Sequence, residues 1–260
     1  MSNFIQLDVN NNIATIILNR PEVFNSFNRT MALNLQSVLD HCETEPKIRA
    51  IVLTGNGKAF CAGQDLKEVT DPDLNPGFKK IIEEHYNPII LKIRQIKKPI
   101  IAAVNGVAAG AGANIALACD IVVAHEKVRF IQAFSLIGLV PDSGGTFFLP
   151  RLVGFQKAQA LAMLGDQISA TEAEQLGMIY KCVAVDEFEN TINQLAEKLS
   201  KMPTKALGFT KQLFNASITN ALDQQLELES KLQIKAANTD DYQEGVTAFL
   251  EKRTPNFKGK

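Results

Sequence analysis

Short apolar runs separated by polar turns fill the first two thirds of the chain. Runs of strand length lie at residues 4–9, 13–19, 50–55, 99–106 and 121–124. The first two flank the turn "NNN" and predict a β-hairpin, whereas the other three are continuous enough for buried strands. Apolar residues at helical spacing occupy 31–43, 78–96 and 113–120. This alternation of strands and helices predicts an α/β core.

The pattern changes from Thr171 onward and becomes mainly helical. Helical segments are expected at 170–178, 187–201, 204–217, 221–237 and 240–253. Strands early in the chain and helices late predict a sheet-containing core domain at 1–200 and a helical C-terminal region at 201–260.

The bulk properties are those of a soluble globular protein, with 260 residues, of which 46% are hydrophobic and 21% charged. A net charge of −1 without a long basic run argues against a nucleic-acid or membrane partner. The most apolar stretch, 99–124, contains Asn105, Asn114 and Asp120, which is not typical of a membrane span. The four cysteines are far apart, and the N-terminus is too polar for a secretory signal. We therefore expect a cytoplasmic protein.

A faint internal repeat joins two small-residue loops to two of the predicted strands. "RAIVLTGNGKAFCAGQ" ends in Ala62-Gly63-Gln64, and "KPIIAAVNGVAAGAG" follows the same order to Ala109-Gly110-Ala111. Such residues let bare backbone approach something closely. Two interpretations stay open at this point: backbone N–H groups that face a ligand, or tight packing of two helices against a sheet.

One acid, Asp142, lies inside the apolar, glycine-rich stretch "GLVPDSGGTFFLPRLVG". Pro-Asp-Ser-Gly is a favoured turn sequence, so the acid can be explained by turn formation alone. The alternative is catalytic. If the two small-residue loops converged, their N–H groups would form an oxyanion hole. A carboxylate opposite that hole could then move a proton at the carbon next to a bound carbonyl.

Several familiar sites are missing from the sequence. "GVAAGAG" does not complete the dinucleotide fingerprint, "GNGKAF" lacks the first glycine of a phosphate-binding loop, and no nucleophile elbow is present. No His/Cys cluster has metal-ligand spacing, so we expect no metal site. The three histidines, His41, His85 and His125, lie on polar helix faces or beside charges and are expected at the surface.

Four segments together resemble the enoyl-CoA hydratase/isomerase (crotonase) superfamily. They are "KAFCAGQDLKE", "KKPIIAAVNGVAAGAGANIALACDIVVA", "GLVPDSGGTFFLPRLVG" and "EGVTAFLEKRTPNF". The resemblance covers essentially the whole chain in order. It implies an α/β spiral of ββα repeats with a C-terminal helical trimerisation region. It also implies an acyl-CoA thioester as substrate, no cofactor other than the coenzyme A of that substrate, and a homotrimer or a dimer of trimers.

Carried over residue by residue, the resemblance assigns the two oxyanion-hole donors to the backbone N–H groups of Gln64 and Ala111. It assigns coenzyme A or substrate contacts to Val23, Phe24, Ala62, Asp65, Leu66, Lys67, Gly110, Asn114 and Phe134. Hydratases of this family use two glutamates, and the matching positions here are Asn114 and Phe134. Ordinary hydration is therefore not expected.

Family isomerases often carry a single acid at the position of Asp142, so the resemblance favours Asp142 as the proton-transferring base. The quoted segments are most similar to isomerases that convert ring-1,2-epoxyphenylacetyl-CoA to the oxepin thioester and also shift double bonds in enoyl-CoA. Four phenylalanines suit a pocket for a flat ring, or equally plain core: Phe130, Phe134, Phe147 and Phe148. The alternatives are a Δ3,Δ2-enoyl-CoA isomerase of fatty-acid oxidation and a non-catalytic acyl-CoA-binding homologue. An RNA-binding homologue lacks the basic stripe it would need.

Overall fold

The computed structural model describes residues 4–260. Met1–Asn3, the start of the N-terminal segment that is too polar for a secretory signal, lie outside the described residues. The larger sheet has the strand order β1 (Ile5–Asn10), β2 (Ile13–Leu18), β3 (Ala50–Gly55), β5 (Ile100–Val104), β7 (Ile121–His125) and β10 (Lys181–Val183). β1 and β2 form the predicted antiparallel hairpin, and the remaining neighbours pair in parallel. The five strands expected from apolar runs are therefore confirmed.

A smaller sheet, which the apolar pattern does not predict, lies beside the first. Its strands run in the order β4 (Ala59–Cys61), β6 (Val107–Ala109), β8 (Arg129–Ile131) and β9 (Gln167–Ser169). Strands of three residues are too short to show a period of two, which is why the sequence pattern misses them. With them, the internal repeat becomes a ββα unit: β3–β4–α2 and β5–β6–α5. The expected architecture of ββα repeats is thus confirmed.

Helices pack against both faces of the larger sheet. The helices in chain order are α1 (Arg29–Thr44), α2 (Leu66–Thr70), α3 (Phe78–Lys80), α4 (Asn87–Gln95), α5 (Ala111–Ala118), α6 (Gly145–Val153), α7 (Phe155–Leu164), α8 (Ala170–Gln175), α9 (Phe188–Lys201), α10 (Thr204–Ser217), α11 (Leu222–Ala237) and α12 (Asp240–Leu250). Of these, α1, α4 and α5 lie on one face of the larger sheet and α9 on the other. Short 3-10 turns occur at Pro21–Val23, Ser135–Ile137 and Val185–Glu187, and a π-helical segment, Ile81–Tyr86, precedes α4.

Neighbouring residues of β3 show how the two faces divide. Ile51 and Leu53 point into the main core, where α1, α4 and α5 pack. Val52 points to the opposite face, into a second apolar cluster that includes Ile192 of α9. A strand buried on both faces needs a continuous apolar run, and this is the pattern that "AIVLTG" carries.

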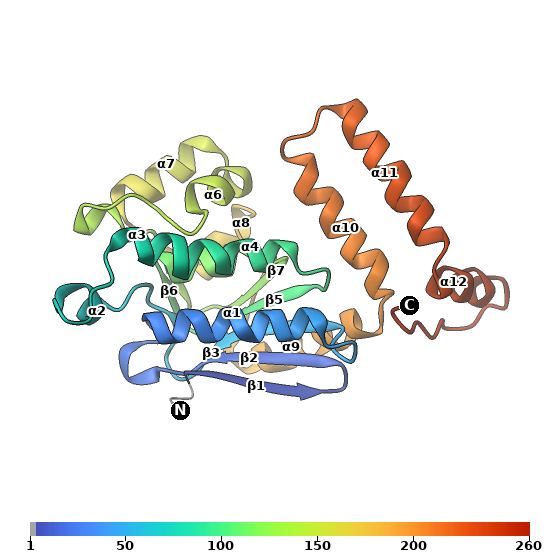
Figure 1. Ribbon diagram of the computed structural model, residues 1–260, viewed down its shortest axis with the longest axis horizontal. Helices are drawn as coiled ribbons and strands as arrows, with labels where there is room; N and C mark the ends of the chain where they lie inside the picture. Colours follow the sequence, from blue (N-terminus) through green and yellow to red (C-terminus); the bar gives the residue numbers. More distant parts are fainter. Residues whose placement is uncertain (1–3) are drawn as a thin grey trace.

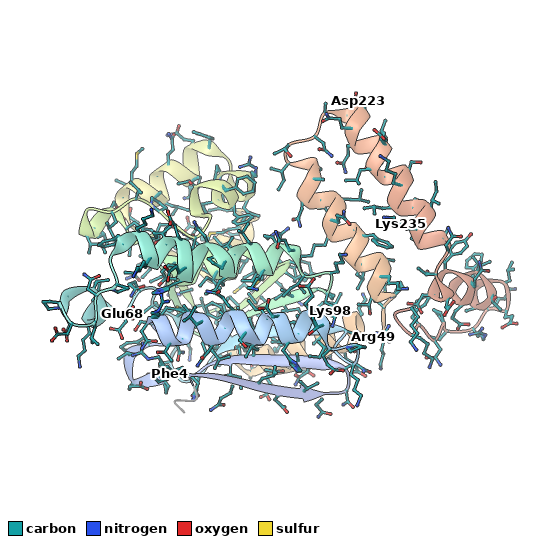
Figure 2. All side chains as sticks on the ribbon, in the orientation of Figure 1. Phe4, Arg49, Glu68, Lys98, Asp223 and Lys235 are labelled. Atoms are coloured by element: carbon teal, nitrogen blue, oxygen red, sulfur yellow. The ribbon has the colours of Figure 1, made fainter. Side chains whose placement is uncertain are left out.

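The last three helices, α10 to α12, extend to one side of the sheet-containing core (Figure 1). Their base is fixed by polar contacts: Lys211 of α10 binds Asp120 at 2.8 Å, and Arg49 donates to Thr204 and to the carbonyl of Met202. Arg49 lies at this end of the core (Figure 2). Large apolar side chains remain exposed on these helices, including Phe214, Leu222 and Phe249. The division into core and oligomerisation region at residue 201 stays a prediction, although α9 ends at Lys201.

Two further observations concern the whole described chain. Within residues 4–260, no helix combines the length and the apolar character needed to cross a bilayer. All four cysteines are free thiols; Cys42, Cys61 and Cys119 are buried, as expected of small apolar residues, and Cys182 is half-buried.

Candidate active site

The two small-residue loops of the internal repeat pack directly against each other. A Cβ added to Gly63 would lie 3.0 Å from the carbonyl oxygen of Ala109 and 3.5 Å from the amide nitrogen of Ala111. A Cβ added to Gly112 would overlap the carbonyl of Cys61. Glycine is required at Gly63 and Gly112 because backbone meets backbone there. The small residues thus let the two loops pack backbone against backbone, which brings the segments of Gln64 and Ala111 together.

The backbone N–H groups of Gln64 and Ala111 are left out of this packing. Phe27 bonds on either side of Gln64, since its N–H donates to the Gly63 carbonyl at 2.7 Å and its carbonyl accepts the N–H of Asp65 at 2.9 Å. Ala111 is the first residue of α5, where an N–H has no partner within the helix. Among residues 4–260, neither N–H meets a hydrogen-bond acceptor. Two such donors on adjacent loops are suited to bind one negatively charged oxygen.

The side chain of Gln64 belongs to a hydrogen-bonded network. The Tyr86 hydroxyl donates to its Oε1 at 3.0 Å, and its Nε2 donates to the carboxylate of Glu68 at 2.8 Å. Glu68 is buried on α2 (Figure 2) and also accepts the backbone N–H of Arg29, the first residue of α1. Burial raises the pKa of Tyr86 well above its ordinary value, so its hydroxyl stays protonated. Sequence patterns miss both partners, because Tyr86 lies 22 residues away along the chain and nothing in the sequence marks Glu68, four residues on, as buried.

His85, the neighbour of Tyr86, corrects one expectation. It was expected at the surface, yet it is 1% exposed. The physical reason is that α1 packs over this segment, where Gln36 donates to the carbonyls of Glu84 and His85. Burial lowers the pKa of His85. The expectation holds for His41, which is exposed, while His125 is half-buried.

Asp142 lies in a tight turn before α6. Its carbonyl accepts the N–H of Gly145 at 2.8 Å, and its carboxylate accepts the Ser143 hydroxyl at 2.9 Å. Ser143 and Gly144 both have positive φ angles, 51° and 74°. Burial raises the pKa of the Asp142 carboxyl from 3.8 to about 6, against a smaller lowering effect of the Ser143 bond. The turn is therefore real, and the acid it holds has a pKa suited to proton transfer near neutral pH.

The two positions at which hydratases carry glutamate hold no acid. Asn114 of α5 is fully buried; its Nδ2 donates to the Asp142 carbonyl at 2.8 Å, and its Oδ1 accepts from Gln132 at 2.8 Å. Phe134 is also buried, and its ring packs over Gly110. Asn114 thereby joins the helix that begins at Ala111 to the turn that holds Asp142.

The remaining predicted contact residues gather around the Gln64 loop. The Ala62 N–H donates to the Phe24 carbonyl at 3.0 Å, which places the exposed Phe24 and its neighbour Val23 beside this loop. Asp65 pairs with Arg20 at 2.8 Å and caps α2. Two further residues, Leu66 and Lys67, are exposed on the first turn of α2.

The four phenylalanines have different surroundings. Phe130 is fully buried within the main core. Phe147 and Phe148 pack edge to face with their ring centroids 5.2 Å apart, and Phe147 is 39% exposed. In residues 4–260, no group of three or more His, Cys, Asp or Glu side chains is placed to hold a metal ion.

Comparison with known proteins identifies the family of the chain. The family model described as enoyl-CoA hydratase/isomerase matches residues 8–260. The chain is 46% identical to the 1,2-epoxyphenylacetyl-CoA isomerase of Escherichia coli over the full length of both proteins. It is 43% identical to a probable enoyl-CoA hydratase of Rhodobacter capsulatus, covering 98% of each chain. The crystal structure of an enoyl-CoA hydratase from Bacillus anthracis superposes with a TM-score of 0.92 at 33% identity, covering 99% of this chain and 100% of that one.

Proposed function

Because this chain belongs to the enoyl-CoA hydratase/isomerase family, which acts on acyl-CoA thioesters, we propose that it is an acyl-CoA isomerase with Asp142 as its base. The observation that carries the proposal is the half-buried Asp142, whose pKa is raised to about 6 and whose turn is tied through Asn114 to the helix that begins at Ala111. Isomerisation adds and removes nothing, so one acid suffices. Hydration has to activate and deliver a water molecule, and the positions of the two hydratase glutamates hold Asn114 and Phe134 here.

In the proposed reaction, the thioester oxygen accepts hydrogen bonds from the N–H groups of Gln64 and Ala111. Asp142 takes a proton from C2, the carbon beside the thioester, and the electron pair moves onto the oxygen to give an enolate. The two donors and the N-terminus of α5 stabilise that negative charge. In a 3-enoyl-CoA, Asp142 then returns the proton to C4 as the double bond moves to C2–C3. With the ring epoxide, the C–C bond shared by the epoxide and the six-membered ring breaks to give the oxepin. Asp142 moves the C2 proton to the ring carbon at the C4 position as the double bond shifts next to the thioester.

The proposed substrate is ring-1,2-epoxyphenylacetyl-CoA. The full-length similarity to the Escherichia coli isomerase of that name supports this choice, as does the aromatic pair Phe147 and Phe148 near the Asp142 turn. The alternative within the family is a Δ3,Δ2-enoyl-CoA isomerase with the same base. A panel of purified thioesters separates the two: a higher kcat/KM for the ring epoxide supports the first, and a higher value for straight-chain 3-enoyl-CoA supports the second.

The proposal also covers assembly and location. The exposed apolar side chains of α10 to α12 support a homotrimer or a dimer of trimers. Sedimentation that finds a stable monomer at micromolar concentration would contradict this. The free thiols are consistent with a cytoplasmic location. Coenzyme A enters as part of the substrate, and the proposed chemistry needs no other cofactor.

Asp142→Asn tests the proposed base. The amide keeps the size and turn-forming ability of Asp142 but cannot accept the proton. We expect turnover to fall at least about 100-fold, the usual scale for loss of a general base, while thioester affinity is retained. Wild-type turnover should rise with pH through about 6, because only the ionised carboxylate accepts a proton. A folded variant with near-normal turnover would leave Asp142 as a turn residue and defeat the proposal.

The same pKa supplies a folding control. Between pH 3.8 and about 6 the folded protein holds this proton more tightly than the unfolded chain does. Stability therefore falls as pH rises through that window, and the ionised Asp142 weakens the fold above it. Asp142→Asn should accordingly melt no earlier than wild type at neutral pH. An earlier melt would show that the loss of turnover includes damage to the fold.

A further inference from the structure

The turn that carries Asp142 is strained. Ser143 follows the acid directly and adopts φ +51°, a left-handed conformation that is uncommon for residues with a Cβ, and Gly144 continues at φ +74°. A strained backbone of this kind persists only where its surroundings hold it in place. The question is therefore which contacts hold the Asp142 peptide.

Two donors hold the carbonyl of Asp142. One is the N–H of Gly145, which closes the turn, and the other is Nδ2 of Asn114, at 2.8 Å in each case. Asn114 comes so close that a Cβ on Gly145 would overlap its amide. The side chain of Asn114 therefore lies directly against the turn, at a place where only glycine leaves room for it.

The orientation of the Asn114 amide is forced by its partners. A backbone carbonyl can only accept, so Nδ2 must face Asp142, and Oδ1 must then face Gln132. Gln132 donates to this Oδ1 from its Nε2 at 2.8 Å, which leaves its own Oε1 buried and without a partner among residues 4–260. An unsatisfied buried acceptor is costly. The unsatisfied acceptor is thus Oε1 of Gln132, while the hydrogen bond from Asn114 to the Asp142 carbonyl is kept.

Asn114 also belongs to the helix that presents one proposed oxyanion-hole donor. It lies one turn after Ala111, and its N–H donates to the carbonyl of Gly110 at 3.2 Å. Every residue of α5 is buried, so this helix is a rigid body within the core. The Asn114 side chain thus links the Ala111 helix to the Asp142 turn by a hydrogen bond.

We propose that Asn114 is a positioning residue, whose amide fixes the Asp142 turn relative to the N–H of Ala111. The inference rests on the proposed role of Asp142 as the base. It gives a new task to a position at which hydratases of the family carry a catalytic glutamate. In this chain both polar atoms of the Asn114 side chain are hydrogen-bonded. Asn114 orients Asp142 through the backbone carbonyl of Asp142.

The test compares Asn114→Ala with a matched variant, Asn105→Ala, in the isomerisation of a straight-chain 3-enoyl-CoA. Asn105 is also a hydrogen-bonded amide; it accepts the Gly55 N–H at 2.9 Å and donates to the Gly57 carbonyl at 3.1 Å, in the loop before β6. We expect Asn114→Ala to lower kcat about 10- to 100-fold with little change in KM, on the scale of a misplaced base. Asn105→Ala should leave kcat within about twofold, because its side-chain partners Gly55 and Gly57 belong to the β3–β4 segment and not to the Asp142 turn.

The pH profile distinguishes positioning from a merely structural role. Without the Asn114 hydrogen bond, the Asp142 carboxyl can relax toward water and lose the burial that raises its pKa. The acidic limb of the pH–kcat profile of Asn114→Ala should therefore move below pH 6. Tyr86, whose pKa is influenced by Asp142, stays neutral throughout this range. Asn105→Ala should keep the acidic limb of the wild-type pH–kcat profile.

Each outcome decides the inference. If Asn114→Ala fails to fold, Asn114→Leu replaces it, because leucine keeps the side-chain volume and removes both bonds. The inference is overturned if either folded variant keeps the wild-type kcat and the wild-type acidic limb of its pH–rate profile. It is also overturned if Asn105→Ala shows the same loss of kcat and the same shift of that limb. Asp142→Asn is assayed in the same series. If that variant turns over normally, the proposed function itself fails; if it is inactive while the Asn114 variants are normal, only the positioning role fails.

Discussion

The loop at Ala111 and the loop at Gln64 each present a free backbone N–H, and they are held by different kinds of contact. The Ala111 loop is held by backbone packing: Gly63 lies against Ala109 and Ala111, and Gly112 lies against Cys61. The Gln64 loop is held by a bridge to Phe27 and by a side-chain network.

The difference bears on how each loop responds to mutation. Around Ala111 an added side-chain atom would meet backbone, which cannot move aside. The loop therefore depends on Gly63 and Gly112 having no Cβ. Around Gln64 the backbone bridge and the side-chain network hold the same residue independently. We therefore expect changes near Ala111 to act on catalysis, and changes of the Gln64 side chain to act mainly on stability.

The largest effect is expected for Ala111→Pro. Proline has no N–H, but it is well tolerated at the first position of a helix, so α5 should persist. Removal of one oxyanion-hole donor costs about 100- to 1,000-fold in rate, and kcat should fall by that amount. The control is Ala111→Gly, which keeps the N–H, with melting curves for both variants. Normal turnover by folded Ala111→Pro would remove Ala111 from the oxyanion hole.

A smaller effect is expected for Gln64→Ala. The backbone N–H and the bridge to Phe27 remain, so kcat should fall less than about tenfold, since no transition-state contact is lost. The buried Tyr86 hydroxyl and Glu68 carboxylate lose a partner, which should destabilise the fold by about 1–3 kcal/mol. Chemical denaturation and steady-state kinetics on one preparation measure both. A 100-fold loss of kcat in a stable variant would mean that the side chain itself contacts the substrate.

The smallest effect is expected for Tyr86→Phe. The ring and its packing against Phe27 are kept, and one hydrogen bond to Gln64 is lost. Stability should fall by about 1 kcal/mol, and kcat should stay close to that of wild type. Because Tyr86 acts through Gln64, the double variant with Gln64→Ala should lose less stability than the two single losses added. Strict additivity would show that the two side chains are not coupled.

The sequence predicted one loop better than the other, for a physical reason. Ala111, Gly112 and Gly63 form a local pattern of small residues, which predicts close backbone approach without any knowledge of the partner. Tyr86 lies 22 residues from Gln64 along the chain, and only the fold places its hydroxyl beside Gln64. Glu68 lies four residues after Gln64, but no local pattern predicts that its carboxylate is buried there. The burial of His85 was missed for the same cause, since the covering residue Gln36 belongs to another helix.

The strands and helices show the same limit. Long apolar runs and helical periods predicted the C-terminal helices and five of the six strands of the larger sheet, but not the three-residue strand β10. The three-residue strands of the smaller sheet carry no period. Asp142 was noticed as an acid in an apolar run, but its clamp by Asn114 and Gln132 depends on contacts across 28 and 18 residues of chain.

The central claim is that Asp142 moves the proton beside the thioester carbonyl while Gln64 and Ala111 hold the oxygen. Hydrogen exchange at C2 of phenylacetyl-CoA in deuterium oxide tests it most directly, because it reports proton removal without requiring any later step. Wild type should exchange these hydrogens, and Asp142→Asn, still able to bind the thioester, should do so at least about 100-fold more slowly. Equal exchange by both proteins would contradict the assignment of Asp142 as the base.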